Sequence, residues 1–293
     1  MSSLSQLGEN AVLERLLRSL PTNPALLTGP GDDCAVVQRD AAWDTLLKTD
    51  CVVEGIHFTP DTEPERIGHK ALARAVSDIA AMGGLPEHAL VTLLVHPGRP
   101  VELLEGLYRG MAPLAAQYGI SLAGGETSSL PQDGLAVSVA LTGRVEHGRA
   151  VLRSGGRPGD VICVSGRLGG SFPSGRHLDF QPRVPLARAL MEAGLAPSAM
   201  MDLSDGLGTD LPRLAAASQC GFEIAPAALP LHPGCTPEQG IGDGEDYELL
   251  LCFRPETYAR VRCMEWPTPV SSIGFLTPGG AVELAPGWQH FAR

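Results

Sequence analysis

The amino-acid sequence predicts an α/β protein with two domains. Apolar residues at helical spacing alternate with short β-like runs, and a turn-rich stretch at 153–160 divides the chain into two halves of similar style. The length of 293 residues and the hydrophobic content of 44% are sufficient for two cores. We therefore expect one domain over residues 1–150 and a second over residues 151–293.

The first half contains an alternation of helices and strands. Apolar residues at helical spacing predict helices at 7–20, 65–81 and 101–118. Runs of β-forming residues predict strands at 45–48, 89–96 and 135–142.

The second half repeats this style. Strands are expected at 161–165, 248–253 and 271–276, and helices at 184–193 and 209–218. Asp202 and Asp205 fall in a predicted loop, and residues 225–244 are rich in Pro and Gly. We find no repeat of about 20–50 residues, which excludes solenoids and propellers.

Composition limits the partners. The chain has 22 Lys+Arg against 33 Asp+Glu, a net charge of −11, and no basic run, so a nucleic-acid partner is not expected. Acidity supports metal binding only weakly, because it also serves solubility. Seven cysteines without a C-x-x-C pair indicate neither a disulfide framework nor a zinc ribbon and fit the cytoplasm. Neither a signal peptide nor a membrane span is expected.

Carboxylates recur in turns that lie far apart in the sequence. They are Asp32, Asp33, Asp50, Asp202 and Asp205, with Asp50 expected at the end of an extended run. Short oxygen ligands on tight turns suit Mg²⁺, which takes its remaining ligands from water and substrate phosphates. Together these turns predict one metal and phosphate site, although a Gly-Asp-Asp turn alone is more often a solvated loop.

Asp78 favours function over structure more than any other single residue. A helical turn of about 100° per residue places Asp78 between Ile67 and Ala71, at the edge of the apolar stripe. An unpaired buried charge is costly, so a cation or strong donors should bind it. The alternative is local pairing with Ser77 or Arg74.

Two further signals are weaker. In Gly124-Gly125-Glu126, backbone N–H groups could approach phosphate oxygens and Glu126 could reach a metal, but Gly pairs are also common in turns. His57 is the only histidine near the acidic turns, and a core or surface imidazole is its alternative. No P-loop motif is present, so an ATP site would need metals and scattered groups.

Seven motifs, in order along nearly the whole chain, resemble the thiamine-monophosphate kinase family. They are Gly31-Asp-Asp-Cys-Ala35, Thr49-Asp50 with Val53-Glu-Gly-Ile-His57-Phe58, Lys70-Ala-Leu-Ala with Ser77-Asp-Ile-Ala-Ala-Met-Gly83, Arg153-Ser-Gly with Pro158-Gly-Asp160, Asp202-Leu-Ser-Asp-Gly-Leu207, Gly244-Glu-Asp-Tyr-Glu248 and Gly287-Trp288-Gln-His290-Phe291. The resemblance implies a two-domain α/β fold of the aminoimidazole-ribonucleotide-synthetase-like superfamily and a homodimer formed through a mixed sheet of the N-terminal domain. It implies transfer of the γ-phosphoryl of ATP to thiamine monophosphate at several Mg²⁺ ions, with the C-terminal domain completing the site.

The resemblance also implies roles for single residues. The implied metal ligands are Asp33, Thr49, Asp50, Asp78, Glu126, Asp202 and Asp205. The implied ATP contacts are Gly125, Arg153, Ser204 and Tyr108, and the implied contacts to the thiamine substrate are His57, Glu245 and Trp288. No separate catalytic residue is implied, because the acceptor phosphate, with a second pKa of about 6, is already anionic near neutrality.

Glu126 is a departure from the family, which usually has Asp at this position. The longer side chain would have to fold back or bind the metal through water. An aminoimidazole-ribonucleotide or selenophosphate synthetase remains an alternative, as does a non-enzymatic nucleotide- or metal-binding homologue. The absence of Cys from the first 33 residues argues against the selenophosphate synthetase.

Overall fold

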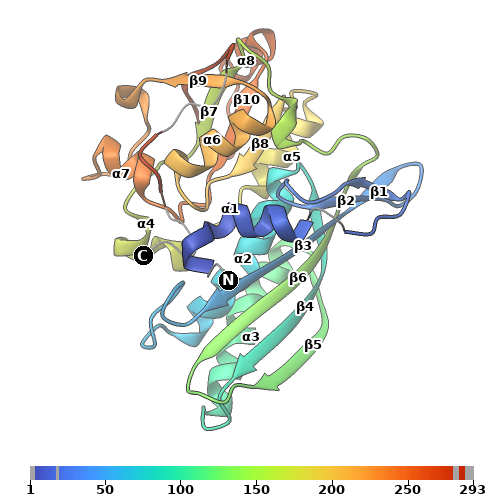
Figure 1. The fold of residues 1–293 in the computed structure, drawn as a ribbon, viewed down its shortest axis with the longest axis vertical. Helices are drawn as coiled ribbons and strands as arrows, with labels where there is room; N and C mark the ends of the chain where they lie inside the picture. Colours follow the sequence, from blue (N-terminus) through green and yellow to red (C-terminus); the bar gives the residue numbers. More distant parts are fainter. Residues whose placement is uncertain (1–3, 18–19, 280–283, 288–293) are drawn as a thin grey trace.

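Two β-sheets, one in each half of the chain, organise the molecule (Figure 1). The computed structural model describes residues 4–17, 20–279 and 284–287. The strands of the larger sheet lie within residues 26–146 and those of the smaller sheet within residues 161–277. In Figure 1 the larger sheet occupies the lower part of the molecule and the smaller sheet the upper part.

The described residues of the first half form three helices and six strands. The helices are α1 (Leu4–Leu17), α2 (Pro64–Ala81) and α3 (Val101–Tyr118). The strands are β1 (Leu26–Thr28), β2 (Ala35–Gln38), β3 (Trp43–Val53), β4 (Leu85–Val95), β5 (Ser121–Ser129) and β6 (Leu135–Glu146). Pro64 begins α2, where its missing N–H has no helical partner to lose, and Gly119 ends α3 in the left-handed conformation.

The larger sheet has the strand order β1-β2-β3-β6-β4-β5. Its pairings are antiparallel except that between β4 and β5, which α3 connects in a crossover. Helices α2 and α3 pack on one face, so alternate residues of β6 are buried. The other face, here called the open face, carries Leu47 and Leu90, whose side chains are 43% and 50% exposed.

The described residues of the second half form short helices and strands. The helices are α4 (Ser171–Ser174), α5 (Val184–Glu192), α6 (Leu207–Ala217), α7 (Pro237–Gly242) and α8 (Pro255–Val261). The strands are β7 (Val161–Ser165), β8 (Ala199–Asp202), β9 (Gly221–Ile224), β10 (Leu249–Phe253) and β11 (Val270–Thr277). They pair antiparallel in the order β8-β10-β7-β11-β9.

One large hydrophobic cluster joins the two halves. It runs from Leu72 and Ile79 on α2 to Leu186 on α5 and Leu251 on β10, all fully buried. A site at this junction therefore stands on closely packed elements rather than on a mobile linker.

The two-sheet architecture confirms the predicted α/β fold class, and several local predictions need correction. Asp50 lies inside β3 rather than at the end of a strand, and Asp202 is the last residue of β8 rather than part of a loop. Gly124 and Gly125, for which a turn was the alternative to a phosphate contact, both lie within strand β5. A Cβ on Gly125 would approach the carbonyl oxygen of Val91 to 1.8 Å, so close packing against β4 accounts for this glycine.

The seven cysteines are free thiols, as expected from their number and spacing. Among the described residues, no helix combines the length and the apolar character that a membrane crossing requires.

Candidate active site

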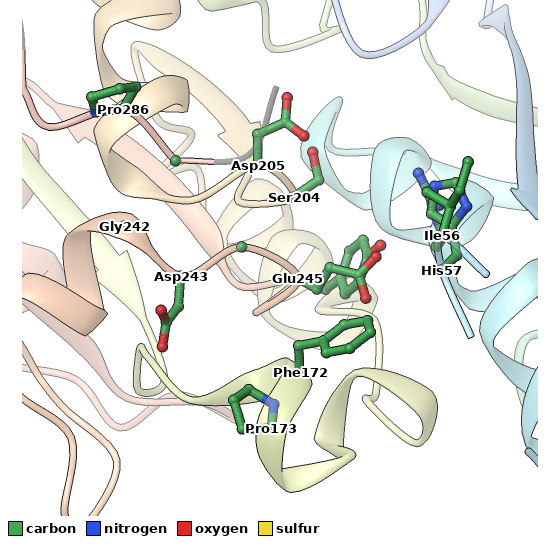
Figure 2. Close-up of a pocket in the computed structure, with 14 residues that line it drawn as sticks. Ile56, His57, Phe172, Pro173, Ser204, Asp205, Gly242, Asp243, Glu245 and Pro286 are labelled. Atoms are coloured by element: carbon green, nitrogen blue, oxygen red, sulfur yellow. The ribbon is translucent and has the colours of Figure 1, made fainter. Parts of the chain in front are cut away.

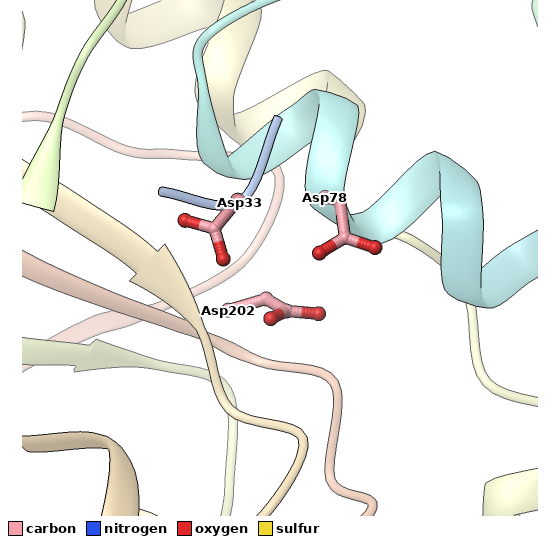
Figure 3. Close-up of side chains that lie close together, drawn as sticks. All are labelled: Asp33, Asp78 and Asp202. Carbon is pink, nitrogen blue, oxygen red and sulfur yellow. The ribbon is translucent and has the colours of Figure 1, made fainter. Parts of the chain in front are cut away.

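Three aspartates from distant segments meet where the two halves touch (Figure 3). Asp33 precedes β2, Asp78 lies near the end of α2, and Asp202 ends β8. One carboxylate oxygen from each lies within 4.8 Å of the others, and all three residues are buried. An oxygen-only ligand set of this kind fits Mg²⁺. The structure thus brings together three residues that the sequence analysis named as metal ligands.

The chain supplies its own partners for these carboxylates. Lys48 Nζ lies 2.8 Å from Asp78, and Arg153 Nη2 donates to Asp33 at 2.6 Å. Ser77, one of the local partners considered for Asp78, instead donates its hydroxyl to Asp202 at 2.7 Å. These contacts explain how several buried carboxylates can coexist in a folded protein.

Burial favours the protonated forms of Asp78 and Asp202. Burial, reinforced by Asp33, raises the pKa of Asp202 to about 7. Burial also raises the pKa of Asp78 well above its ordinary value, although Lys48 opposes the shift. Divalent cations compete with protons for such ligands, so metal binding here should release protons.

Asp50 borders the cluster from β3. It shares a strand face with Lys48, because residues i and i+2 point the same way. Its carboxylate accepts the Cys51 N–H at 2.7 Å and lies 3.1 Å from Arg74 Nη2. The Nε of Arg74 is buried and has no hydrogen-bond partner among the described residues.

The loop after β8 carries Ser204 and Asp205. Asp205 forms an ion pair with Arg213, and its backbone N–H donates to Asp210 Oδ2 at 3.0 Å. Asp210, in the first turn of α6, is fully buried, and burial together with Asp205 raises its pKa. Asp210 therefore shapes the loop that presents Asp205.

A cavity of about 480 Å³ lies beside this loop (Figure 2). Ile56, His57 and Arg74 line it from the first half, and Phe172, Glu245 and Tyr247 line it from the second. Ser204 and Asp205 also line it, and Arg74 contacts Asp50, so the cavity borders the carboxylates. Its volume suits a small organic molecule.

His57 faces this cavity as a neutral imidazole. Its Nδ1 accepts the N–H of Val53 at 3.0 Å, which leaves the proton of the neutral ring on Nε2. Burial, followed by the nearby Arg74 guanidinium, lowers the pKa of His57 to about 4. At neutral pH His57 can therefore donate a hydrogen bond but carries no charge.

Glu245 is one of three carboxylates that line the cavity, with Asp205 and Asp243. It forms an ion pair with Lys70, and His177 Nδ1 lies 2.8 Å from its Oε2. Burial opposes its ionisation, but His177 and Lys70 outweigh burial and lower the pKa of Glu245 to about 2. Tyr247 stacks on Phe180 with ring centroids 3.9 Å apart, and Phe172 stacks on His177 at 4.4 Å. The cavity thus offers the ionised and fixed carboxylate of Glu245 beside aromatic side chains.

Other residues from the sequence analysis lie away from this arrangement within one chain. Thr49 is exposed and has the side-chain direction opposite to Asp50, and Tyr108 is exposed on α3. Glu126 is exposed on β5, where Ser128 donates to it at 3.0 Å. Gly125 is aligned with Asp50 through β4 and β6, so three strand spacings, or about 14 Å, separate them.

Trp288 lies outside the described residues. The segment before it reaches the cavity, because Pro286 and Gly287 line the wall and the Gly287 N–H donates to Thr209 Oγ1 at 2.8 Å.

The sequence analysis gave no role to Lys48, Lys70 or Asp210. Lys70, Arg74 and Asp78 follow one another at intervals of four on α2, which places them along one helix face and could have identified that face as functional. Side chains two residues apart on a strand point to the same face, and this alternation could likewise have placed Lys48 beside Asp50. The only signal at Asp210 is an acidic residue in the first turn of a predicted helix, and such residues are common.

Comparison with known proteins assigns this chain to a family. Residues 31–145 match the family model described as AIR synthase related protein, N-terminal domain. The chain is 36% identical to the thiamine-monophosphate kinase of Rhodopirellula baltica, over 86% of this chain and 84% of that protein. It is also 36% identical to the thiamine-monophosphate kinase of Escherichia coli strain K12, over 90% and 92%. A solved structure described as AaThiL complexed with AMPPCP and TMP superposes with a TM-score of 0.84 at 30% identity, over 99% of each chain.

The fold and the match of the N-terminal half define an AIR-synthase-related protein. Within that class, the chain belongs to the thiamine-monophosphate kinase family and is a kinase. The resemblance found from the seven motifs is thereby confirmed, and the synthetases of the same superfamily are set aside.

Proposed function

We propose that this protein transfers the γ-phosphoryl group of ATP to thiamine monophosphate and forms thiamine diphosphate. The observation that carries the proposal is the buried set Asp33, Asp78 and Asp202 beside a cavity whose wall carries the fixed carboxylate of Glu245. A carboxylate among aromatic walls suits the cationic thiazolium ring of thiamine. The names of the similar kinases, and the AMPPCP and TMP of the similar complex, support the same assignment.

We further propose that several Mg²⁺ ions bind to Asp33, Asp50, Asp78, Asp202 and Asp205. When bound, these ions would neutralise the charge that accumulates as two polyanions meet. Arg153 and Lys48 already compensate part of the negative charge of the ligands. Arg74, between Asp50 and the cavity, is in position to orient the acceptor phosphate.

No side chain is needed to remove a proton from the acceptor. The attacking phosphate oxygen is anionic near neutrality, since the second pKa of a phosphate monoester is about 6. His57, neutral at that pH, would donate a hydrogen bond to the substrate, and Glu245 would orient its ring. Ser204 and Arg153, from residues 151–293, would contact ATP, while Asp33, Asp50 and Asp78, from residues 1–150, would bind metal. These two parts of the chain, which we regard as two domains, would therefore each supply part of the site.

We also propose a homodimer formed through the open face. Leu47, Leu90 and Ala140 leave apolar surface on this face, and Glu126 lies on it, in register with Thr92 of β4. Thr49, Gly125, Glu126 and Tyr108 remain proposed ligand contacts. Since one chain does not gather Thr49, Gly125 and Glu126 with the aspartates, these three could share a site with them only if a second copy covers this face. Tyr108 lies on α3, which packs on the opposite face of the sheet. The free thiols support a cytoplasmic location.

The direct test is incubation with ATP, Mg²⁺ and thiamine monophosphate, followed by chromatographic detection of thiamine diphosphate. We expect product only when all three are present, and none when thiamine replaces its monophosphate. Absence of thiamine diphosphate from a folded, Mg²⁺-supplied sample would refute the proposal.

A further inference from the structure

Lysine is rare in this chain and concentrated at the candidate site. Of the 22 Lys and Arg residues, only Lys48 and Lys70 are lysines, and they contact Asp78 and Glu245. We propose that Lys70 is a positioning residue for the acceptor, which holds Glu245 and His57 in one fixed arrangement at the cavity. This inference rests on the proposed function, in which both residues contact the thiamine substrate.

The ammonium of Lys70 joins two opposite walls of the cavity. Lys70 is fully buried on α2, and its Nζ donates to the backbone oxygen of His57 at 2.7 Å and to Glu245 Oε2. His177 Nδ1 lies 2.7 Å from the same Nζ. This His177 nitrogen also lies 2.8 Å from Glu245 Oε2 and can make only one of the two hydrogen bonds, so the His57 oxygen and Glu245 account for two of the three ammonium hydrogens. A cation paired in this way fixes the directions of its partners.

The backbone around Glu245 needs such a restraint. Glu245 and Tyr247 have φ angles of 65° and 51°, in the left-handed region that side chains other than glycine rarely adopt. Their N–H groups donate to Ser204 O at 2.7 Å and Leu203 O at 2.8 Å. These bonds anchor the loop to the segment after β8, and Lys70 anchors it to the first half. The same restraint therefore aligns the cavity wall with Ser204 of the proposed nucleotide site.

Charge supports the same role. Burial lowers the pKa of Lys70 to about 8, so the ammonium stays largely charged at neutral pH. Glu245, beside His177 and Lys70, remains ionised. Lys70 thus keeps the carboxylate of Glu245 both charged and oriented, although Lys70 does not line the cavity itself.

The test is Lys70→Met, which removes the ammonium and keeps a long flexible side chain. We expect KM for thiamine monophosphate to rise about tenfold, on the scale of one lost charge-assisted hydrogen bond, and KM for ATP to change less than about twofold. In a Glu245→Gln background, Lys70→Met should raise KM for thiamine monophosphate little further, because its effect passes through Glu245.

Arg66→Met is the matched control. Arg66 lies one turn earlier on α2 and also bridges to the second half, through Asp179, but it does not line the cavity. Both KM values should stay unchanged in this variant.

Lys70→Arg provides a second variant should the methionine variant fail to fold. It retains the charge, but the planar guanidinium cannot reproduce the three directions of an ammonium, so KM for thiamine monophosphate should still rise. Equal rises in both KM values, or an unchanged KM for thiamine monophosphate in the folded Lys70 variants, would overturn the positioning role. A wild-type protein that forms no thiamine diphosphate would instead overturn the proposed function, so the two failures are distinguishable.

Discussion

Individual charge pairs explain how this protein holds many carboxylates in a small volume. Asp33 has Arg153, Asp78 has Lys48 and Asp50 has Arg74, so each of these three acids has a cation from the chain itself, and Asp202 accepts a hydrogen bond from Ser77. Removing one partner from a buried pair leaves an uncompensated charge, which is more costly than the pair was worth. Substitutions at this cluster should therefore affect both chemistry and stability.

Asp78→Asn should lower turnover by more than about 100-fold, on the scale of removing one electrostatic stabiliser. The amide has nearly the same shape, so the fold should persist, which circular dichroism can check. Asp133→Asn is the control, because Asp133 pairs with Arg99 at the surface and should leave turnover unchanged. Near-wild-type turnover of Asp78→Asn at saturating Mg²⁺ would argue against Asp78 as a metal ligand.

Lys48→Met should increase the dependence of the fold on Mg²⁺. Without the ammonium near Asp78, the metal-free carboxylates repel one another more strongly, and bound cations restore more stability. Thermal unfolding at about pH 8, with EDTA or with Mg²⁺, should show a larger metal-induced rise in Tm than in the wild type. Arg39→Met, which breaks an exposed pair with Glu87, should show the wild-type rise. An equal rise in Lys48→Met would contradict this account.

At the scale of elements, periodicity allowed part of the fold to be predicted. The helices at 65–81 and 101–118 and the strand at 161–165 agree closely with α2, α3 and β7, because each has a continuous apolar pattern. Strand β5 escaped prediction because it is exposed and contains two glycines, so it lacks apolar alternation and has few β-forming side chains.

Turn chemistry likewise predicted part of the candidate site. The positions of Asp33 and Asp205 follow from Gly-rich segments, since such turns can present short acids, whereas Asp202 ends strand β8 rather than lying in the predicted loop. The cations that pair with the acids of the site could not be predicted from the sequence. Lys48 meets Asp78, and Lys70 meets Glu245, only after distant elements pack.

The open face of the larger sheet leads to a prediction about assembly. Leu90→Asp places a charge on this face, where a second copy would bury it, and should shift a dimer toward monomer. Val101→Asp is a matched control, because Val101 is 65% exposed at the start of α3, away from this face. Sedimentation velocity would measure both. A dimer that persists in Leu90→Asp would argue against an interface at this position.

For the whole molecule, the buried acids make stability depend on pH and metal together. The pKa of Asp202 is about 7 in the folded protein against an ordinary value of 3.8. Between these values the folded state binds a proton that the unfolded state has released, so the stability of the metal-free protein should fall as pH rises. Asp246, whose pKa burial also raises to about 7, should contribute in the same direction.

Mg²⁺ separates these two contributions. Because Mg²⁺ binds the ionised carboxylates, it should remove the loss of stability that the aspartate cluster causes as pH rises. The loss that Asp246 causes should remain. Tm measured from about pH 4.5 to 7.5, with EDTA or with Mg²⁺, tests this, and Asp202→Asn should flatten only the metal-free curve. Parallel curves in the two buffers would rule out the cluster as their source.

The presence of only two lysines gives the molecule a built-in pair of spectroscopic reporters. Protein grown with ¹³C at the lysine Cε should show one resonance from Lys48, beside Asp78, and one from Lys70, behind the cavity. A Mg²⁺ titration should move chiefly the first signal, and thiamine monophosphate chiefly the second. The order in which the two signals respond would then report the order of ligand addition in a protein with no substitution and no attached probe.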